Sequence, residues 1–140
     1  MKILIIDGQG GGIGRQLVEA LKRAGENDVA CVGTNAIATT AMLRAGATRA
    51  ATGENAAIVA CREAEVIAGP VGIVIADALL GEVTPRMAAA VGQSRARKVL
   101  IPVDQCGNRV VGVPAGTTTA QLVAQAVEAI CRVDADDAKS

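Results

Sequence analysis

The stretch KILIIDGQGGGIGRQLVEAL, at residues 2–21, constrains the fold more than any other part of the sequence. The segment 2–7 has a continuous apolar centre of strand length, which is typical of a parallel strand covered on both faces. From Gly12 the apolar residues recur at helical spacing, and Gly25 closes the predicted helix. Five glycines at residues 8–14 separate the two patterns. A strand, a glycine loop and a helix in this order predict the first unit of a parallel α/β fold.

The same alternation continues along the chain. Further strands are predicted at 29–33, 47–53, 65–68 and 98–103, and further helices at 37–45, 54–64, 84–91 and 119–131. The run RVVGV at 109–113 follows a turn and predicts an antiparallel partner of the preceding strand. We therefore expect one three-layer Rossmann-like α/β domain over residues 1–132. Its sheet should be mostly parallel, with about five parallel strands plus one antiparallel edge strand, and residues 133–140 should form a solvated tail.

The composition of the chain excludes several classes of protein. Phe, Tyr and Trp are absent, and 14 basic residues balance 14 acidic ones. Duplex nucleic acid requires a cationic stripe and single strands require stacking aromatics, so we expect no nucleic-acid partner. No apolar stretch is long enough for a membrane span and no signal peptide is evident, which favours a cytoplasmic protein without a membrane partner. A core of small side chains buries less area than an aromatic one, so we also expect a homo-oligomer.

The four cysteines do not predict a metal site. Cys31, Cys61, Cys106 and Cys131 never form a CxxC pair, and the chain has no histidine. The usual zinc ligand sets are therefore missing, and reduced cysteines acting as small apolar residues are the better interpretation.

The glycine loop fits the spacing GxxxGxG through Gly8, Gly12 and Gly14. Glycines allow positive φ and close backbone approach, and the start of the following helix attracts anionic oxygens. The spacing resembles the cofactor loop of short-chain dehydrogenases and reductases, which implies a nucleotide-like site. The alternative is that the glycines only permit tight packing between strand and helix.

Three departures from those reductases argue against their chemistry. Asp7 stands where they usually carry a hydroxyl residue, and a carboxylate repels a pyrophosphate unless its charge is balanced. We favour a role for Asp7 in accepting N–H groups of the loop over metal or ligand contact. The acid that binds ribose is missing from the end of the second predicted strand, which reads Gly33-Thr34-Asn35. The absence of tyrosine removes the catalytic Ser/Tyr/Lys set of the family.

Ligand-binding candidates lie at the predicted carboxyl ends of the strands, where open α/β sheets bind ligands. Thr34-Asn35 and Glu54-Asn55 also fit the alternative of helix capping, and Arg15 fits that of a solvated side chain. The full candidate set is Gly8, Gln9, Gly10, Gly11, Gly12, Ile13, Gly14, Arg15, Thr34, Asn35, Glu54, Asn55, Gly69 and Pro70. The expected ligand is a small anionic molecule, with a dinucleotide or a mononucleotide as the cofactor class.

Candidates for chemistry are few. The glycine-punctuated segment 69–85 either closes over a pocket or packs against another subunit, and its acids Asp77 and Glu82 are candidates for proton transfer. Asp7 is a third catalytic candidate. Asp104 and Cys106 follow the last predicted parallel strand, but a thiolate nucleophile usually needs a base and the chain has no histidine.

Several motifs together resemble one family of short bacterial proteins classed as a domain of unknown function. They are IDGQGGGIG, GTN.IAT.AML.AGA...ATGENA, GP.GI, LLGE.TP and K.LIPV, spread over residues 2 to about 130. The resemblance implies a cytoplasmic Rossmann-type domain and offers no catalytic residue. Three hypotheses follow from the sequence: a module that binds an anionic metabolite, an enzyme that uses carboxylates at the same site, and an oligomeric interaction protein with an empty loop.

Overall fold

The computed structural model describes residues 1–103 and 107–137. Five strands form one sheet in the order β3-β2-β1-β4-β5, and all neighbouring strands are parallel. They are β1 (Ile3–Asp7), β2 (Val29–Gly33), β3 (Arg49–Thr52), β4 (Val66–Pro70) and β5 (Arg97–Ile101). The Rossmann-like α/β fold predicted from the sequence is confirmed.

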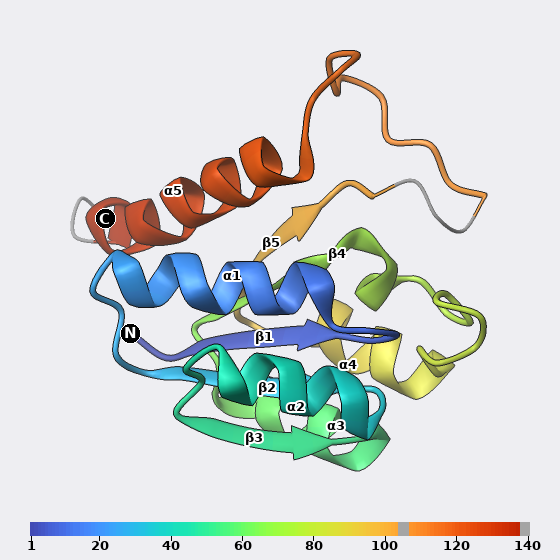
Figure 1. Cartoon of the computed structure of the whole chain (residues 1–140). Helices are drawn as coiled ribbons and strands as arrows, with labels where there is room; N and C mark the ends of the chain where they lie inside the picture. The colour runs from blue at the N-terminus through green and yellow to red at the C-terminus, as the bar shows by residue number, and fades with distance from the viewer. Residues whose placement is uncertain (104–106, 138–140) are drawn as a thin grey trace.

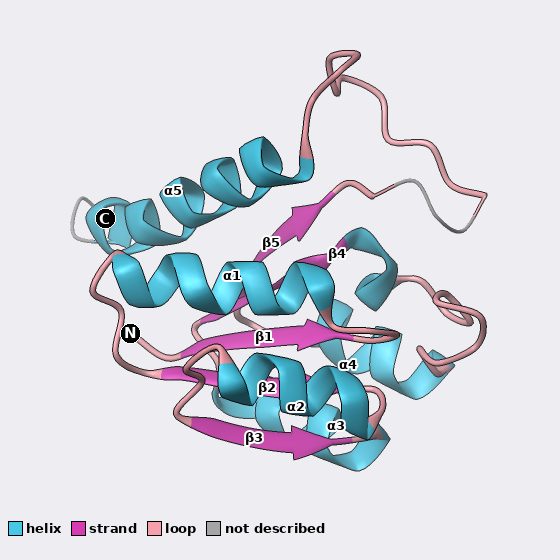
Figure 2. Cartoon of the chain, viewed as in Figure 1, coloured by secondary structure: helices cyan, strands magenta, loops and turns pink. Residues whose placement is uncertain are grey.

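Helices cover both faces of this sheet (Figures 1 and 2). On one face lie α1 (Gly12–Arg23), α2 (Ala36–Arg44) and α5 (Thr119–Asp137); on the other lie α3 (Glu54–Glu63) and α4 (Pro85–Gln93). A short 3-10 helix, η1 (Val71–Val74), follows β4. The predicted N-cap of α4 is confirmed, because Thr84 Oγ1 accepts a hydrogen bond from the Met87 N–H, with Pro85 at the first helical position.

The two halves of the core meet at β1, whose five residues are all buried. Ile3 and Ile5 pack toward α1 and α5, whereas Leu4 and Ile6 pack toward α3 and α4. Successive side chains of a strand point to opposite faces, so a continuous apolar run suits a strand with helices on both sides. Truncating one of these buried side chains to alanine would cost about 2–5 kcal/mol.

The prediction of an antiparallel edge strand after β5 is wrong. Residues 109–113 form no strand, and the described part of the chain contains no antiparallel pair. Instead, residues 107–118 lie in an extended arm that stands away from the sheet (Figure 1). Gly112 and Gly116 have φ of +90° and +80° and interrupt an extended backbone. Valine-rich segments favour strands through packing, and nothing packs against Val111, which is 87% exposed.

The last helix is longer than predicted. It continues beyond Cys131 to Asp137, because Val133 extends the buried stripe of Val123, Ala126 and Ile130. Within the described residues, no helix is both long and apolar enough to cross a bilayer.

Candidate functional site

The glycine loop lies where the strand order reverses. β1 is flanked by β2 on one side and by β4 on the other, so the chain leaves β1 at the switch point of the sheet. Crevices at such points, beyond the carboxyl ends of the strands, are the usual ligand sites of open α/β sheets. The loop connects the end of β1 directly to α1, in the position that the sequence predicts.

The buried carboxylate of Asp7 holds both ends of the glycine loop by hydrogen bonds. Asp7 is the one buried charged residue in the described part of the chain, at 4% exposure. Its Oδ1 accepts a hydrogen bond from the Gly8 N–H and its Oδ2 accepts one from the Gly14 N–H, both at 2.7 Å. The bracing role favoured from the sequence is therefore what the hydrogen bonds show.

The environment of Asp7 shifts its acidity. Burial raises the pKa of Asp7 above its usual value, because the charged form loses hydration, and the nearby charge of Glu82 adds to the rise. The N–H groups of Gly14, Gly8 and Ile13 oppose this shift by stabilising the carboxylate, but burial prevails.

Three of the five loop glycines are closely packed against other residues. A Cβ on Gly8 would lie 2.4 Å from Thr34 Oγ1, and one on Gly14 would lie 2.5 Å from Met42 Sδ. Gly11 has φ of +72°, and its Cβ would lie 2.9 Å from the Cα of Ala38 in α2. The packing alternative considered for the loop is thus correct for these three positions.

Packing does not explain why the other two loop positions, Gly10 and Gly12, are glycine. A Cβ on Gly10 or on Gly12 would meet no atom within 4 Å, and neither residue has a positive φ. Their N–H groups also donate to no acceptor in the described part of the protein. Helix α1 begins with Gly11 as its N-cap, which has no side chain to cap the helix. Asp7 accepts the Gly14 N–H in the first turn, so it is the Gly12 N–H, at the first helical position, that is left without an acceptor among the described residues.

A cavity of about 280 Å³ opens beside these two glycines. Asp7 and the loop residues Gly8–Ile13 form one wall. The remaining lining comes from Gln16 in α1, Pro70 at the end of β4, Leu79, Val103 after β5 and Thr119 at the start of α5. The cavity therefore lies on the side of the loop that faces β4 and β5.

On the opposite side, the side chain of Glu82 holds the loop. Its Oε1 accepts hydrogen bonds from the Gln9 N–H at 2.9 Å, from Thr34 Oγ1 at 2.6 Å and from Asn35 Nδ2 at 2.7 Å. Partial burial acts to raise the pKa of Glu82, but the hydrogen bonds from Thr34, Gln9 and Asn35 outweigh it, so the pKa lies below its usual value.

Asn35 combines two roles. Its Oδ1 accepts a hydrogen bond from the Ala38 N–H and caps α2, which is the capping alternative given for Asn35 in the sequence analysis. Its Nδ2 donates to Gln9 O as well as to Glu82, so the cap of α2 is tied to the glycine loop.

Comparison with known proteins places the chain in a family. Residues 2–134 match the model of a domain of unknown function, DUF3842. The chain belongs to this family. Membership confirms the family resemblance found in the sequence, and the description of the family names no reaction or ligand.

Other comparisons give little more. Among solved structures, the family member is similar to a nucleoside-diphosphate-sugar epimerase from Pseudomonas aeruginosa, with a TM-score of 0.49 and 14% identity. The similarity covers 97% of this chain and 49% of the epimerase, so the chain spans about half the length of that protein. No curated protein matches the chain.

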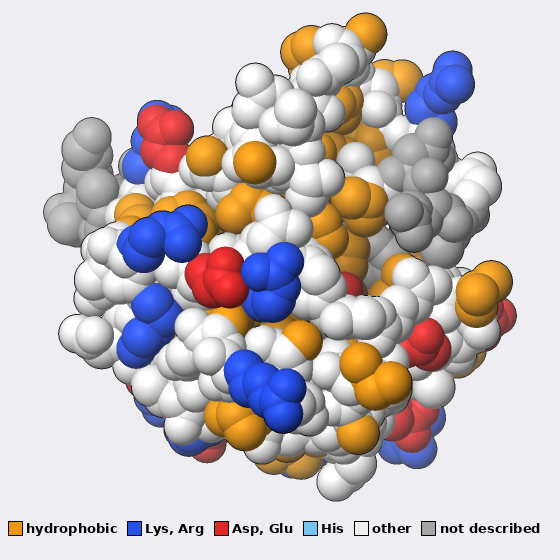
Figure 3. Space-filling model, viewed as in Figure 1, with side chains coloured by type: hydrophobic (Ala, Val, Ile, Leu, Met, Phe, Trp, Pro, Cys, Tyr) orange, Lys and Arg blue, Asp and Glu red, His pale blue; other side chains and the backbone are white. Residues whose placement is uncertain are grey.

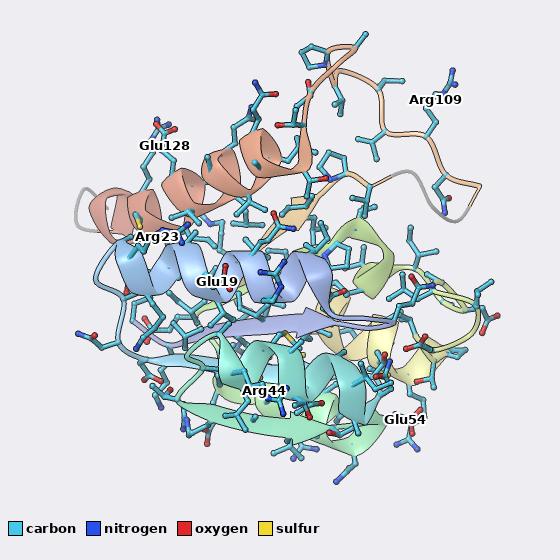
Figure 4. The ribbon with its side chains drawn as sticks, in the orientation of Figure 1. Glu19, Arg23, Arg44, Glu54, Arg109 and Glu128 are labelled. Carbon is cyan, nitrogen blue, oxygen red and sulfur yellow. The ribbon has the colours of Figure 1, made fainter. Side chains whose placement is uncertain are left out.

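Several predicted site residues lie outside the cavity of this family member. Arg15 forms an exposed ion pair with Glu19 of α1, at 3.1 Å, and Figure 4 labels Glu19 on this helix. Glu54 lies at the start of α3, beyond the end of β3, and its Oε1 accepts a hydrogen bond from Thr84 Oγ1. Asn55 and Asp77 are exposed and do not line the cavity. Gly69 is buried in β4, where a Cβ would lie 2.1 Å from the Ile6 carbonyl oxygen, so packing explains this glycine.

Sequence reasoning missed four residues of the lining. Val103 lies just after β5, and Thr119 is the first residue of α5. Because the sequence predicts both of these elements, it could also have placed these two residues at the rim of the cavity. Gln16 lies one helical turn beyond Gly12. Leu79 belongs to a segment with no periodic pattern, and only the tertiary structure locates it.

None of the three cysteines that the structure describes lines the cavity. Burial raises the pKa of the Cys31 and Cys61 thiols to about 11, which leaves both as inert thiols at neutral pH. Asp104 and Cys106 lie outside the described residues. Among the residues that are described, no group of three His, Cys, Asp or Glu side chains is arranged to hold a metal ion.

Proposed function

We propose that this protein is a small binding module that holds a nucleotide or another anionic metabolite at its glycine loop. The observation that carries the proposal is the pair Gly10 and Gly12. Both line the cavity, both have N–H groups without an acceptor in the described structure, and neither owes its missing side chain to packing or to φ.

Physical chemistry explains why a ligand would require these glycines. Backbone N–H groups at the start of a helix stabilise an anionic oxygen, and this effect needs close approach of the anion to the backbone. A side chain at either glycine would project into the space that the anion requires. The position of the cavity at the switch point supports the same proposal.

A binding screen with a variant of Gly12 tests it. Gly12→Val should fold, because a side chain there meets open space, but it should lose the thermal shift that phosphate, nucleotides or acyl carriers give to the unmodified protein. Native mass spectrometry of freshly purified protein is the second readout. The chain has no Trp or Tyr, so absorbance near 260 nm would report a co-purified base. A screen with no shift, together with an empty subunit mass, would refute the proposal.

One observation favours a second function, catalysis by carboxylates. Asp7 lines the cavity, and the structure shifts the pKa values of Asp7 and Glu82 in opposite directions. A pair of carboxyl groups whose pKa values are shifted apart is typical of a general acid and a general base in one active site. Because both Asp7 oxygens accept loop N–H groups, we rank this function below binding. If it is correct, an Asp7→Asn variant should lose turnover even at ligand concentrations where it still shows the ligand's thermal shift.

A further inference from the structure

The side of the glycine loop that faces β2 is filled by the protein itself. Three donors from two parts of the chain converge on one oxygen of Glu82: the Gln9 N–H, the Thr34 hydroxyl and the Asn35 amide. These are an amide of the loop and two side chains at the carboxyl end of β2. A carboxylate oxygen thus lies where a bound anion would otherwise take those donors.

On the side that faces β2, side chains also fill the space next to Gly8 of the loop. A Cβ on Gly8 would meet Thr34 Oγ1 at 2.4 Å, Leu79 Cδ1 at 2.9 Å and Glu82 Oε1 at 3.1 Å. Leu79 is only 6% exposed, and with Ala78 and Val83 it packs in the core between the sheet and α4. The side chains that close this side are therefore anchored in the core.

The backbone of the same segment is strained. Asp77, Leu79 and Leu80 have φ of +67°, +56° and +55°, a conformation that leucine rarely adopts. Such strain persists only where the surrounding structure enforces it. Hydrogen bonds from the Asp77 N–H to the Val83 carbonyl, at 2.8 Å, and from the Val83 N–H to the Ala78 carbonyl, at 3.1 Å, hold the segment closed.

A dinucleotide would need both sides of the loop. In Rossmann domains the pyrophosphate lies on the glycine loop, and an acid at the end of the second strand binds the ribose hydroxyls of the adenosine half. Here a carboxylate is present at the end of β2, but it comes from Glu82 and is bonded to the loop itself. The open cavity, of about 280 Å³, lies only on the side of β4 and β5.

We propose that Glu82 and Leu79 seal the β2 side of the loop, so that the site takes a ligand with one phosphate-sized anionic group and rejects dinucleotides. This inference rests on the proposed function, because it specifies the ligand class of the same cavity. A second phosphate or an adenosine ribose would displace hydrogen-bonded donors and approach the negative charge of Glu82.

Calorimetric titration of the full chain with inorganic phosphate, AMP and UMP as single-anion probes, and with NAD+ as the dinucleotide probe, tests the inference. The unmodified protein should bind at least one single-anion probe and should bind NAD+ at least about tenfold more weakly than that probe. Glu82→Ala removes the charge and opens the space, so NAD+ affinity should rise about tenfold or more. The affinity for the single-anion probe should change less than NAD+ affinity does.

A second variant distinguishes the effect of charge from that of space. Glu82→Gln keeps an oxygen in place but removes the charge, so its gain in NAD+ affinity should be smaller; it also replaces the alanine variant if that variant fails to fold. Equal binding of AMP and NAD+ by the unmodified protein would overturn this inference and leave the proposed function intact. So would folded variants at Glu82 with no gain for NAD+. Failure of every probe with all three proteins would overturn the proposed function, and this inference with it.

Discussion

Asp7 Oδ2 accepts a 2.7 Å hydrogen bond from the N–H of Gly14, so the last residue of β1 holds the first turn of α1. The second oxygen of the same carboxylate holds Gly8, at the other end of the loop. One buried side chain therefore fixes the shape of a seven-residue glycine segment whose backbone would otherwise be among the most flexible in the chain. The glycines provide close approach, and the carboxylate removes their conformational freedom.

Asp7→Asn should destabilise the protein. An amide has only one oxygen, so either the Gly8 or the Gly14 N–H loses its acceptor in a buried position, at a cost of about 1–3 kcal/mol. Relief of the buried charge offsets part of this loss. Urea unfolding measures the difference, and Glu19→Gln, which removes an exposed carboxylate from α1, is the matched control. An Asp7→Asn variant as stable as the control would contradict the bracing role.

Two neighbouring glycines should respond oppositely to alanine. Gly11→Ala places a side chain at a φ of +72° and against the backbone of Ala38, so it should cost about 1–2 kcal/mol for the left-handed conformation alone. Gly12→Ala meets open space at the first position of α1 and should leave stability unchanged or raise it by up to about 1 kcal/mol. Thermal unfolding of the two variants side by side tests this contrast. Equal losses would show that the loop is packed differently from the structure.

Glu82 should make stability depend on pH in a defined direction. Its pKa is lowered on folding, so its contribution is present above the unfolded value of about 4.5 and is lost as pH falls through the lower folded pKa. The stability difference between the unmodified protein and Glu82→Gln should therefore be largest near neutral pH and should shrink toward pH 3. Unfolding at a series of pH values measures it, with Glu19→Gln again as the control. A difference that stays constant over this range would show that the Glu82 charge does not stabilise the fold.

The cysteines should differ in reactivity. Cys31 and Cys61 are buried, with pKa values raised to about 11, so neither should be alkylated in the folded protein at pH 8. Cys131 is exposed on α5 and should be alkylated. Peptide mass mapping after brief iodoacetamide treatment separates the sites, and unfolded protein provides the control in which Cys31 and Cys61 react. Rapid modification of Cys61 in the folded state would contradict its burial in the core beside α3.

We also expect this protein to form a homo-oligomer. The arm at residues 107–118 exposes Val110, Val111 and Val113, and Figure 3 shows hydrophobic side chains in the hollow beneath it. That hollow lies between β5, the arm and α5 and includes Leu100 and Leu122. The side chain of Arg109 points outward from the arm (Figure 4). Native mass spectrometry should show more than one subunit, and Val111→Asp should lower the number. A monomer at micromolar concentration would refute the expectation.

The sequence predicted most of the fold because its signals are local. The apolar run of β1, the amphipathic period of α1 and the cap at Thr84 depend on near neighbours in the chain, and all three are confirmed. The run at residues 109–113 shows the limit of such signals, because a strand also needs a partner to pair with and the structure provides none. The end of α5 shows the same limit, since the burial of Val133 depends on the packing of α5 against α1.

The site divides in the same way. By itself, the sequence determined where the glycine loop lies, since a loop after the first parallel strand must emerge at the ligand end of the sheet. Only the tertiary structure decided which glycines are free and which are packed, because Ala38 and Met42, which crowd Gly11 and Gly14, are more than 25 residues away along the chain. It also decided that Glu82 closes the end of β2, where the sequence shows no acid. Glu82 is 48 positions from Thr34 and 47 positions from Asn35 along the chain. Hydrogen bonds over such separations depend on how the sheet brings the ends of strands together, which no local sequence pattern encodes.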